Sequence, residues 1–521
     1  MKRTPKIGAY VLETLTTGMY VDPLDTVREL VQNAADSIRK AEESQVLGRN
    51  AGRIEMRIGH NNRSLEVRDN GLGIPADAAL EQLLNVGMSD KDIEQDAGFR
   101  GIGRLAGIAF CDSLRFRTST QGETTATVLD FDSVGIRKAI SPRNRRKREM
   151  ADVLAKYSEF STEKCRRTDH FFEVTMLGIA DSTTQFLDPT ALEMYLSESA
   201  PVDFDPQDFV FAPKIQRWAR KHRLPLPTVS LTIATPSMSR EVFKPYRTTY
   251  ATSHQRTRQF EVTIEDVAFY PEQVGEKSRF WIWYGVSDLP GRIGDQRVAG
   301  FRLRKNNISL GGSERVTELF REITADSGRF NAYYVGEIHV LCPNAIPNAR
   351  RDGFENVGSW PRIRGELLPF VQERRSQAYE ASKARNLPVQ KITASAEQTL
   401  AKAETSISVG IASQDERDKR LKEVRKERER VEQWVDAHKK PEDSKKVRPF
   451  VKRLQDAETR LQDEKNFVAQ KARSSLDRKQ RKLLQDVVSI VYSTLEGQSC
   501  KRATQCAEAV RRAISRKYGK S

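Results

Sequence analysis

Three polar clusters between Asp22 and Phe110 hold the residue types in this chain that could do chemistry. The first contains Glu29, Asn33 and Asp36, whose spacing places them within roughly 60° of one another on a helix, with apolar side chains on the opposite arc. A carboxylate one turn from an amide oxygen suits a general base that orients a water molecule beside a Mg²⁺ ligand. The alternative is an ordinary amphipathic helix that carries no site.

The second cluster is an alternating stretch that starts at Leu65 and runs into Asp69, Gly71, Gly73 and Ile74. Glycine permits positive φ and a close approach of the backbone to a ligand. A carboxylate at the end of a strand can accept a hydrogen bond from an exocyclic amine such as that of adenine. Asp-Asn-Gly is also common in turns, so the stretch equally fits a plain junction between a strand and a turn.

The third cluster is a glycine-rich run in which Gly98, Gly101 and Gly103 precede an apolar segment. Glycines at the start of a helix leave backbone N–H groups that can receive a phosphate, and the helix dipole favours the negative charge. The order of the glycines matches neither the dinucleotide fingerprint nor the P-loop motif. This run alone is therefore weak evidence for a nucleotide site.

Together, the three clusters resemble in order and spacing the N, G1 and G2 boxes of the GHKL ATPases, the superfamily of gyrase, heat-shock protein 90, histidine kinases and MutL. The resemblance implies a Bergerat-type sandwich that binds ATP and Mg²⁺ and hydrolyses ATP to ADP and phosphate. It implies Glu29 as the catalytic base, Asn33 as the Mg²⁺ ligand and Asp69 as the carboxylate that reads adenine. Further nucleotide contacts are implied for Asp36, Gly71, Gly73, Ile74, Met88, Lys91, Gly98, Arg100, Gly101, Ile102 and Gly103.

Two further segments follow from the same resemblance. Residues 76–97, between the second and third clusters, correspond to the mobile lid of these ATPases. The superfamily usually has a Gly-Thr pair before a late strand, with the threonine near adenine. In the best candidate strand here, residues 170–177, Phe172 stands at the threonine position.

A second resemblance concerns residues 334–340 and the loop at 346–352. These residues are similar to the middle domain of heat-shock protein 90, where a strand leads to an Asn-x-Ser-Arg-Glu loop whose arginine reaches the γ-phosphate. Arg351 aligns with that arginine, while Arg350 replaces the serine and Asp352 replaces the glutamate. The resemblance implies a catalytic role for Arg351, and the alternative is a basic loop at the edge of a sheet.

The order of the elements predicts an α+β fold class with three domains, which 521 residues can accommodate. We expect a GHKL ATP-binding domain over residues 1–185, an α/β middle or transducer-like domain over 186–370, and an α-helical coiled-coil and basic region over 371–521. Apolar alternation predicts strands at 53–58, 65–69, 113–118, 124–131 and 171–176 in the first domain. In the second domain it predicts strands at 228–234, 259–264, 279–285, 298–303 and 333–341.

The C-terminal region has apolar residues at three- and four-residue spacing on both sides of Pro441, which predicts an antiparallel coiled-coil hairpin with Arg428 at one core position. An apolar helix is expected at 483–495. The predicted seam consists of Leu421, Val424, Val431, Val435, Leu454, Ala457, Leu461 and Val468.

Positive charge is concentrated in the same region. The whole chain has a net charge of +16, and residues 361–521 hold 38 Lys and Arg against 23 Asp and Glu. Such a surplus attracts polyanions. It predicts contact with nucleic acid through the tail residues Arg511, Arg512, Arg516 and Lys517, and the alternative is a solvated helical arm.

Cysteine usage and apolar runs indicate the compartment. The five cysteines are scattered, with no Cys-x-x-Cys pair, so the sequence supports neither a disulfide framework nor a zinc site. No apolar run is long enough for a membrane span, and the first residues do not lead into a signal-type stretch. We therefore expect a cytoplasmic protein without membrane contact.

The leading functional interpretation is an ATP-hydrolysing conformational clamp resembling a divergent, bacterial-type heat-shock protein 90 chaperone, a homodimer acting on a protein client. A second interpretation is a clamp on nucleic acid resembling MutL or MORC proteins, in DNA maintenance or antiviral defence, which the basic C-terminal region favours. A third is a nucleotide-gated scaffold that does not hydrolyse ATP. The short segment before Glu29 argues against a histidine kinase, and the lack of an acidic cleavage motif argues against a topoisomerase subunit.

Overall fold

A computed structural model describes most of the chain, in two compact units. The first unit extends to Tyr379 and the second begins at Glu380. The described residues are 7–16, 22–87, 103–141, 148–253, 260–275, 277–348, 350–385, 388–409, 411, 414–437, 441–463, 483, 486, 487 and 510.

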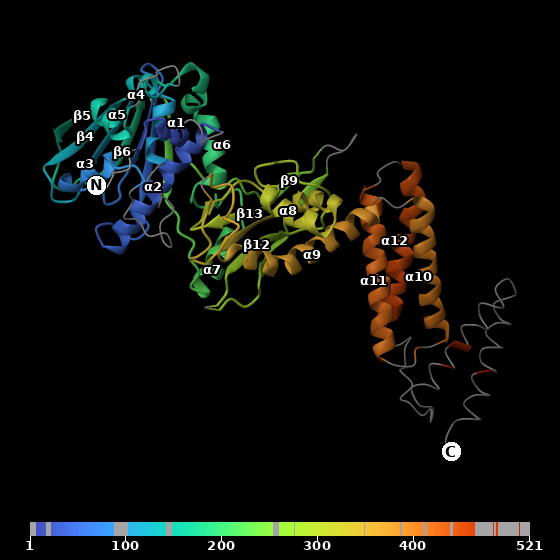
Figure 1. Cartoon of the computed structure of the whole chain (residues 1–521). Helices are drawn as coiled ribbons and strands as arrows, with labels where there is room; N and C mark the ends of the chain where they lie inside the picture. Colours follow the sequence, from blue (N-terminus) through green and yellow to red (C-terminus); the bar gives the residue numbers. More distant parts are fainter. Residues whose placement is uncertain are drawn as a thin grey trace, which may run out of the picture. The chain divides into compact units, whose positions relative to one another are not determined.

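The first unit contains a mixed eight-stranded sheet, part of which is labelled in Figure 1. Its strands follow the order β5-β4-β3-β6-β2-β1-β7-β8. All neighbouring pairs are antiparallel except β1 and β7, which are parallel. The strands are β1 (Arg53–Gly59), β2 (Ser64–Asp69), β3 (Ser113–Ser119), β4 (Thr125–Asp132), β5 (Ser158–Lys164), β6 (Phe171–Leu177), β7 (Ser230–Thr235) and β8 (Met238–Glu241). The large sheet fits a GHKL ATPase domain.

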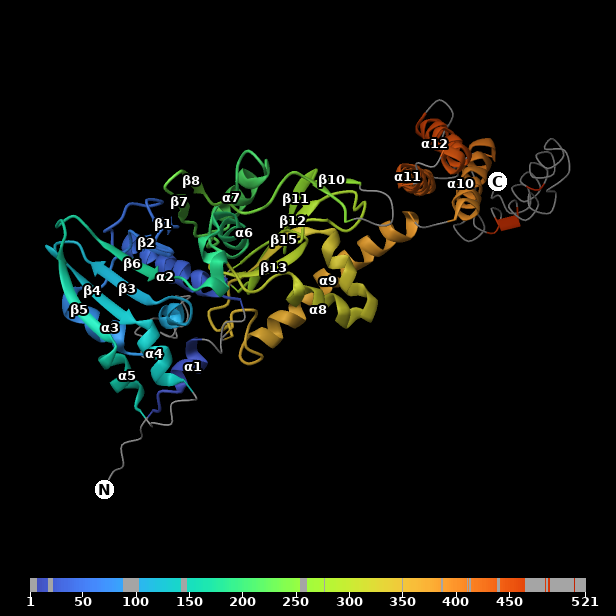
Figure 2. The same ribbon diagram turned by 90° about the horizontal axis from the view of Figure 1, so that it is seen from above.

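Helix α2 (Leu24–Glu43) packs against β1 and β2, as Figure 2 shows from above. Its apolar stripe, including Val27, Val31 and Ile38, is buried in one core with the inward side chains of the sheet. Because these positions recur every three or four residues, burying them fixes which side of the helix carries the polar residues.

Other helical segments complete this part of the unit. The glycine-led apolar segment, which was expected to be helical, forms a 3₁₀ helix, η1 (Gly103–Ala109). The remaining elements before β7 are α1 (Val11–Thr16), α3 (Ala76–Leu84), α4 (Ser133–Ile140), α5 (Met150–Lys156), η2 (Asp181–Leu187), α6 (Pro189–Ser199) and α7 (Ala212–Lys221).

The second sheet of this unit has five strands in the order β11-β12-β15-β13-β14, and β9 (Thr249–Ala251) pairs with β10 (Glu261–Thr263) nearby in the sequence. The strands are β11 (Asp266–Tyr270), β12 (Phe280–Val286), β13 (Gly300–Lys305), β14 (Ile308–Ser309) and β15 (Val335–Val340). Strands β13 and β15 are parallel, and α8 (Glu314–Ile323) and η3 (Ala325–Tyr333) lie between them in the chain.

One strand lies in a different sheet from the one predicted. The stretch at 228–234 was expected in the second domain, but β7 pairs with β1 in the first sheet, with Ile54 opposite Leu231. Alternation predicts that a stretch is a strand, but it does not select the partner strand. The same reasoning missed β5, whose side chains are mostly exposed, and the short strands β8, β9, β11 and β14.

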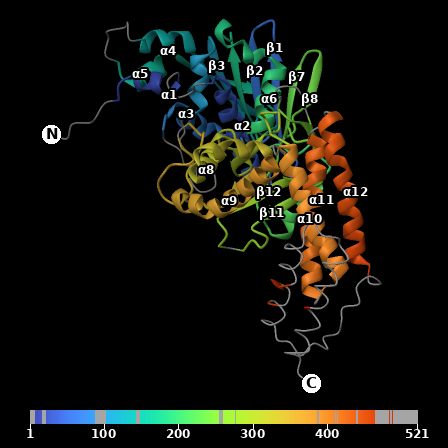
Figure 3. The same ribbon diagram turned by 90° about the vertical axis from the view of Figure 1, so that its right-hand side faces the viewer.

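The second unit contains α10 (Val389–Val409), α11 (Gln414–Ala437) and α12 (Pro441–Gln462), which pack side by side (Figure 3). Helix α9 (Trp360–Arg385) precedes them and crosses the boundary between the units. The predicted hairpin corresponds to α11 and α12, and α10 contributes Ile392, Ala396 and Leu400 to their shared core. The prediction of a two-helix hairpin was therefore incomplete, because the apolar side chains of α11 and α12 also pack against a third helix, α10. The expected helix at 483–495 lies almost wholly outside the described residues.

No described helix is both long and apolar enough to span a membrane.

Candidate functional site

Helix α2, which packs against β1 and β2, carries the first predicted cluster. Glu29 is 6% exposed and Asp36 is 5% exposed, while Asn33 is half-buried. Gln32, three residues after Glu29 and therefore on the same side of the helix, is 1% exposed. A buried carboxylate and amide side by side need polar partners, because an unpaired polar group in the interior costs free energy.

Arg351 supplies the partner for Glu29. Its Nε lies 2.7 Å from Glu29 Oε1, and its Nη1 donates to Gln32 Oε1. Arg351 is 5% exposed, so the ion pair is largely shielded from water. The pair joins α2 to the loop that follows β15, more than 300 residues later in the chain, and the structure therefore brings together the two residues predicted to be catalytic.

The loop around Arg351 is held in a defined conformation. Arg351 has φ 54°, a left-handed conformation that is uncommon for residues other than glycine. Asn348 Nδ2 donates to Asp352 Oδ1 at 2.6 Å, and Arg315 Nη2 lies 3.0 Å from Asp352 Oδ2. Although burial alone would raise the pKa of Asp352, these partners hold it below the ordinary value. Asp352, which stands at the glutamate position of the resembling loop, thus anchors the turn that presents Arg351.

A second contact joins the same loop to α2. Arg28 Nη2 donates to the carbonyl oxygen of Arg350 at 3.1 Å, while Arg28 Nη1 lies 3.0 Å from Asp25. Tyr195 on α6 donates to Asp25 at 2.6 Å. Arg28 was not predicted as a site residue, although it lies next to Glu29 in the chain.

Gly103, the last glycine of the third cluster, lies against Glu29. A Cβ atom placed on Gly103 would lie 2.4 Å from Glu29 Oε2, so only glycine lets the backbone approach the carboxylate this closely. Next to it, Arg104 Nη2 donates to the carbonyl oxygen of Asn85. Burial lowers the pKa of Arg104 to about 10, which leaves it positively charged at neutral pH. The start of η1, which contains Gly103 and Arg104, therefore lies next to Glu29, the predicted base.

The Asp69 turn forms a second, separate part of the candidate site. Asp69 is 3% exposed, and its Oδ1 accepts a hydrogen bond from the Gly71 N–H at 2.8 Å. A Cβ on Gly71 would lie 2.3 Å from Ser37 Oγ on α2, so this turn packs directly on the helix that carries Glu29. The sequence analysis missed His170, whose Nδ1 lies 2.8 Å from the Gly71 carbonyl oxygen.

Gly73 and Ile74 continue this turn against β3. Gly73 has φ +70°, and a Cβ there would lie 2.0 Å from the Ser119 carbonyl oxygen. The Ile74 N–H donates to Thr118 Oγ1 at 2.8 Å, and Thr118 in turn donates to the Phe171 carbonyl oxygen at 3.0 Å. The packing of this turn therefore requires glycine at positions 71 and 73, because a Cβ atom at either position would clash with a neighbouring residue.

The departure from the Gly-Thr pattern has a structural counterpart. Phe172 lies between Asp69 on β2 and Thr118 on β3 in the register of the sheet. The hydroxyl of Thr118 on β3 thus lies one strand away from Phe172 on β6, where the resemblance placed the threonine. It was missed because the register of three strands cannot be read from one segment.

Six predicted contact residues, from the lid and the glycine run, lie outside the described residues: Met88, Lys91, Gly98, Arg100, Gly101 and Ile102.

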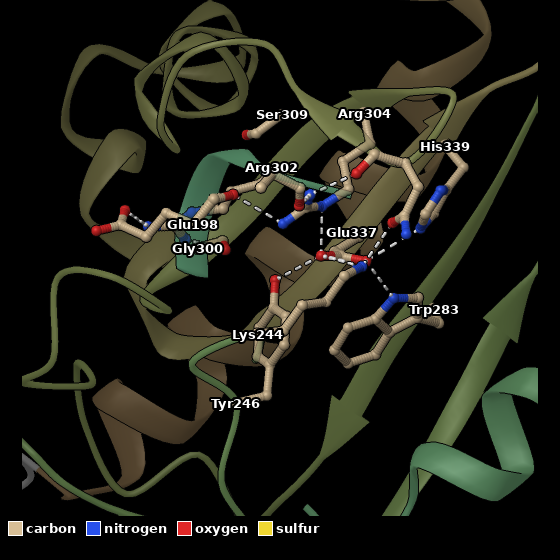
Figure 4. A network of polar contacts seen from close by, with 12 residues as sticks. Glu198, Lys244, Tyr246, Trp283, Gly300, Arg302, Arg304, Ser309, Glu337 and His339 are labelled. Carbon is tan, nitrogen blue, oxygen red and sulfur yellow. Dashed lines mark hydrogen bonds and ion pairs between the residues drawn. The ribbon is translucent and has the colours of Figure 1, made fainter. Parts of the chain in front are cut away.

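A charged network inside the second sheet lies upstream of the Arg351 loop (Figure 4). Glu337 on β15 is fully buried and accepts hydrogen bonds from Lys244 Nζ at 2.7 Å and from Trp283 Nε1 at 3.0 Å. Arg304 on β13 forms an ion pair with the same carboxylate, and His339 Nε2 lies 3.1 Å from it. These partners fix β13 and β15 against each other.

The electrostatics of this network follow from its burial. Burial alone would raise the pKa of Glu337, but Arg304 and Lys244 hold it well below the ordinary value. Burial lowers the pKa of Lys244 to about 7 and that of His339 to about 4. His339 is therefore neutral at pH 7, and its Nε2–H donates to Glu337.

The network also holds the end of α6. Arg304 Nη2 donates to the Glu198 carbonyl oxygen at 2.9 Å, and Arg302 Nη2 lies 3.3 Å from the Glu198 carboxylate. Cations near the C-terminus of a helix interact favourably with its dipole. Because α6 also contacts α2 through Tyr195 and Asp25, the second sheet reaches α2 by two routes, through α6 and through Arg351.

Known proteins resemble this part of the chain. Residues 23–159 match the family described as histidine kinase-, DNA gyrase B- and HSP90-like ATPases. This part of the chain is therefore similar to the GHKL-type ATPase domains, and the match lies within the first unit.

Among curated proteins, the chain is similar to the chaperone protein HtpG of Colwellia psychrerythraea (strain 34H), with 24% identity over 174 residues. The matched part is 30% of this chain and 27% of the relative, so the similarity spans about a quarter of that chaperone.

The described residues fit a metal-bound triphosphate at the Glu29 end of the site. Gln32 Nε2 is buried and has no hydrogen-bond partner among the described residues, and the same amide group contacts the Arg351 guanidinium through its oxygen. Two donors converging next to a carboxylate suit an anionic ligand. No group of three or more His, Cys, Asp or Glu suited to a metal occurs in the described part of the chain. Mg²⁺ commonly takes one or two protein oxygens and completes its shell with phosphate and water, so Asn33 would suffice as its protein ligand.

Proposed function

We propose that this protein is an ATP-hydrolysing conformational clamp, with Glu29 as the general base, Asn33 as the Mg²⁺ ligand and Asp69 as the adenine acceptor. The observation that carries the proposal is the ion pair between Glu29 and Arg351, at 2.7 Å. It joins the helix of the ATP-binding domain to a loop after the second sheet, which is what an ATPase needs if hydrolysis depends on the position of a second domain.

The ion pair also explains how hydrolysis would be controlled. In the ion pair, the Arg351 guanidinium occupies the carboxylate oxygen of Glu29 that a water molecule would otherwise contact. A γ-phosphate arriving between the two residues competes for Arg351 through charge-assisted hydrogen bonds. Arg351 then stabilises negative charge at the phosphate, and Glu29 becomes available to orient and deprotonate water.

Each remaining residue has a matching task in this proposal. Mg²⁺ held by Asn33 neutralises charge on the phosphate oxygens. The backbone at Gly103 offers N–H groups close to Glu29, and Gln32 Nε2 is a further donor. Closure of the lid would exclude water from these groups and strengthen every polar contact among them.

Dimeric clamp action on a protein client is part of the proposal, and it is supported by the similarity to HtpG. The alternative client is nucleic acid, as in a MutL- or MORC-like clamp. This second candidate is supported by the charge of the second unit, where α12 carries more basic than acidic residues while α10 and α11 are balanced.

The test is to compare ATP turnover and Mg·ATP affinity in Glu29→Ala and in a matched control, Glu43→Ala. Glu43 ends the same helix and pairs at the surface with Arg39. General-base assistance is typically worth 10²- to 10⁴-fold, so Glu29→Ala should lose about that much turnover while retaining affinity. Glu43→Ala should behave like the parent protein. Equal losses of affinity and turnover in Glu29→Ala, or a turnover that Glu29→Ala leaves unchanged, would remove Glu29 as the base. ATP binding without measurable turnover in the parent protein would support the scaffold that does not hydrolyse ATP.

A further inference from the structure

Helix α12 carries an unbalanced set of charges on its exposed face. Its buried stripe recurs at three- and four-residue spacing and packs into the core shared with α10 and α11. On the opposite side, within roughly 160° of arc, the exposed residues from Lys445 to Arg460 include six basic side chains and one acidic side chain, that of Asp456. We call these six the cationic face of α12: Lys445, Lys446, Arg448, Lys452, Arg453 and Arg460.

The neighbouring helices are balanced by comparison. Helix α11 contains eight acidic and eight basic residues, and α10 contains two of each. Much of the α11 charge is paired, as in Arg420 with Glu423 at 2.6 Å and Arg430 with Glu427 at 3.2 Å. The positive surplus of this bundle therefore lies on α12.

From Ser444 onward, α12 has two acidic residues, of which Asp456 lies within the arc of the cationic face and Glu458 lies outside it. Glu458 points to α11, where it pairs with Arg425 at 2.9 Å and with Arg428 at 3.0 Å. Arg453 lies over the Phe450 ring. Among the described residues, the other five members of the cationic face have neither an ion pair nor a hydrogen bond to their side chains.

The chemistry of this face distinguishes among polyanions. No large apolar side chain is exposed on α12, whereas protein interfaces are centred on such side chains, and helices that lie on membranes insert them. Binding sites for single-stranded nucleic acid add aromatic platforms for base stacking, and the exposed part of α12 has none. A row of flexible cations without apolar anchors suits regularly spaced phosphates instead.

We propose that the cationic face of α12 is a docking surface for the phosphate backbone of duplex nucleic acid. From Lys445 to Arg460 the helix extends about 22 Å, which is long enough to lie along several phosphates of one strand, spaced about 3.4 Å apart along the duplex axis. About five phosphate contacts would give a slope of log K against log salt near −4 to −5. Recognition would be independent of base sequence, because backbone contacts carry no sequence information. The proposal does not rest on ATP hydrolysis.

The experiment measures the affinity of the full chain for a labelled duplex over a series of salt concentrations, without nucleotide. The test variant combines Lys445→Ala, Arg448→Ala and Lys452→Ala. The matched control combines Lys419→Ala, Lys422→Ala and Lys426→Ala, which removes the same charge from exposed positions of α11. Alanine favours helix at all six positions, and circular dichroism confirms that the bundle remains folded.

The α12 variant should bind at least tenfold more weakly at low salt, with a slope shallower by about 3, whereas the α11 control should keep the parent slope. Equal losses in both variants would overturn the proposal, because they would reflect net charge alone. Tighter binding of a single strand or of an acidic polypeptide than of the duplex would overturn the assigned ligand. An α12 variant with the parent slope would also overturn the proposal, and the tail residues Arg511 and Lys517 would then be the next positions to test.

Discussion

Arg351 Nε and Glu29 Oε1 lie 2.7 Å apart, although the two residues come from opposite ends of the first unit's sequence. The pair is largely buried, so it is expected to be stronger than a surface salt bridge but costly to break from one side. It combines a structural role, joining two parts of the unit, with a chemical one, because each partner is proposed to act on the same phosphate.

The coupling between Glu29 and Arg351 should be measurable as stability. In a double-mutant cycle with Glu29→Gln and Arg351→Gln, we expect each single variant to lose about 3 kcal/mol of unfolding free energy, because it leaves a buried charge unpaired. The double variant should lose less than the sum by more than 1 kcal/mol. Urea titration measures all four proteins, and additive losses would contradict the pairing.

Adenine recognition is tested at Asp69. Asp69→Asn keeps an oxygen for the Gly71 N–H but presents an amide donor to the exocyclic amine of adenine, a mismatch worth roughly 1 to 3 kcal/mol, or about 5- to 150-fold in ATP affinity. Asp130→Asn, on β4 beside Arg115, is the surface control and should bind ATP normally. Calorimetry measures the ATP affinity of both variants, and an unchanged affinity in Asp69→Asn would exclude Asp69 from the site. GTP should bind poorly to the parent protein for the same reason.

The buried network predicts how the stability depends on pH. The folded protein holds the pKa of His339 at about 4, below the ordinary value of 6.5, so the unfolded chain takes up this proton first as the pH falls. Stability should therefore drop between about pH 6.5 and pH 4, with a contribution from His339 on the order of 3 kcal/mol. Glu337 acts in the same direction at lower pH, because its folded pKa is also held below the ordinary value.

His339→Gln isolates this contribution. Glutamine can still donate to Glu337 but does not titrate, so the variant should lose less stability than the parent protein over that range of pH. Lys244 and Arg304, which face the same carboxylate, are unchanged and serve as an internal reference. Parallel curves of urea midpoint against pH for the two proteins would show that His339 binds protons equally in the folded and unfolded states, which would contradict the lowered pKa.

The sequence predicted the local features of the site better than their assembly. The spacing of Glu29, Asn33 and Asp36 predicted a shared helical face, because apolar periodicity determines which side of α2 is buried. Gln32 was missed although it lies one turn from Glu29, since a glutamine on a polar face has no distinctive signature. The motif around Arg351 indicated a catalytic loop, but its contact with α2 depends on tertiary structure.

Tertiary choices account for the differences in the fold. The stretch that forms β7 was predicted as a strand, but its pairing with β1 depends on competition between two sheets. Likewise, the apolar positions of α11 and α12 predicted that they pack together, but not that α10 would complete their core. The balance of charge within each helix was visible in the sequence, whereas the exposed position of the α12 cations required the packing of three helices.

The most direct test of the central claim is the rate of ATP turnover in Arg351→Ala compared with Arg350→Ala, each measured together with its ATP affinity. Arg350 precedes Arg351 and is exposed, and its backbone carbonyl makes the contact with Arg28, so its side chain can be removed as a control. We predict that Arg351→Ala lowers turnover by about 10³-fold or more, as for other arginines that stabilise a transferred phosphoryl group, with little change in affinity. Arg350→Ala should retain turnover. If Arg351→Ala hydrolysed ATP as fast as Arg350→Ala, the second sheet would have no part in catalysis and the proposed control of Glu29 would be wrong.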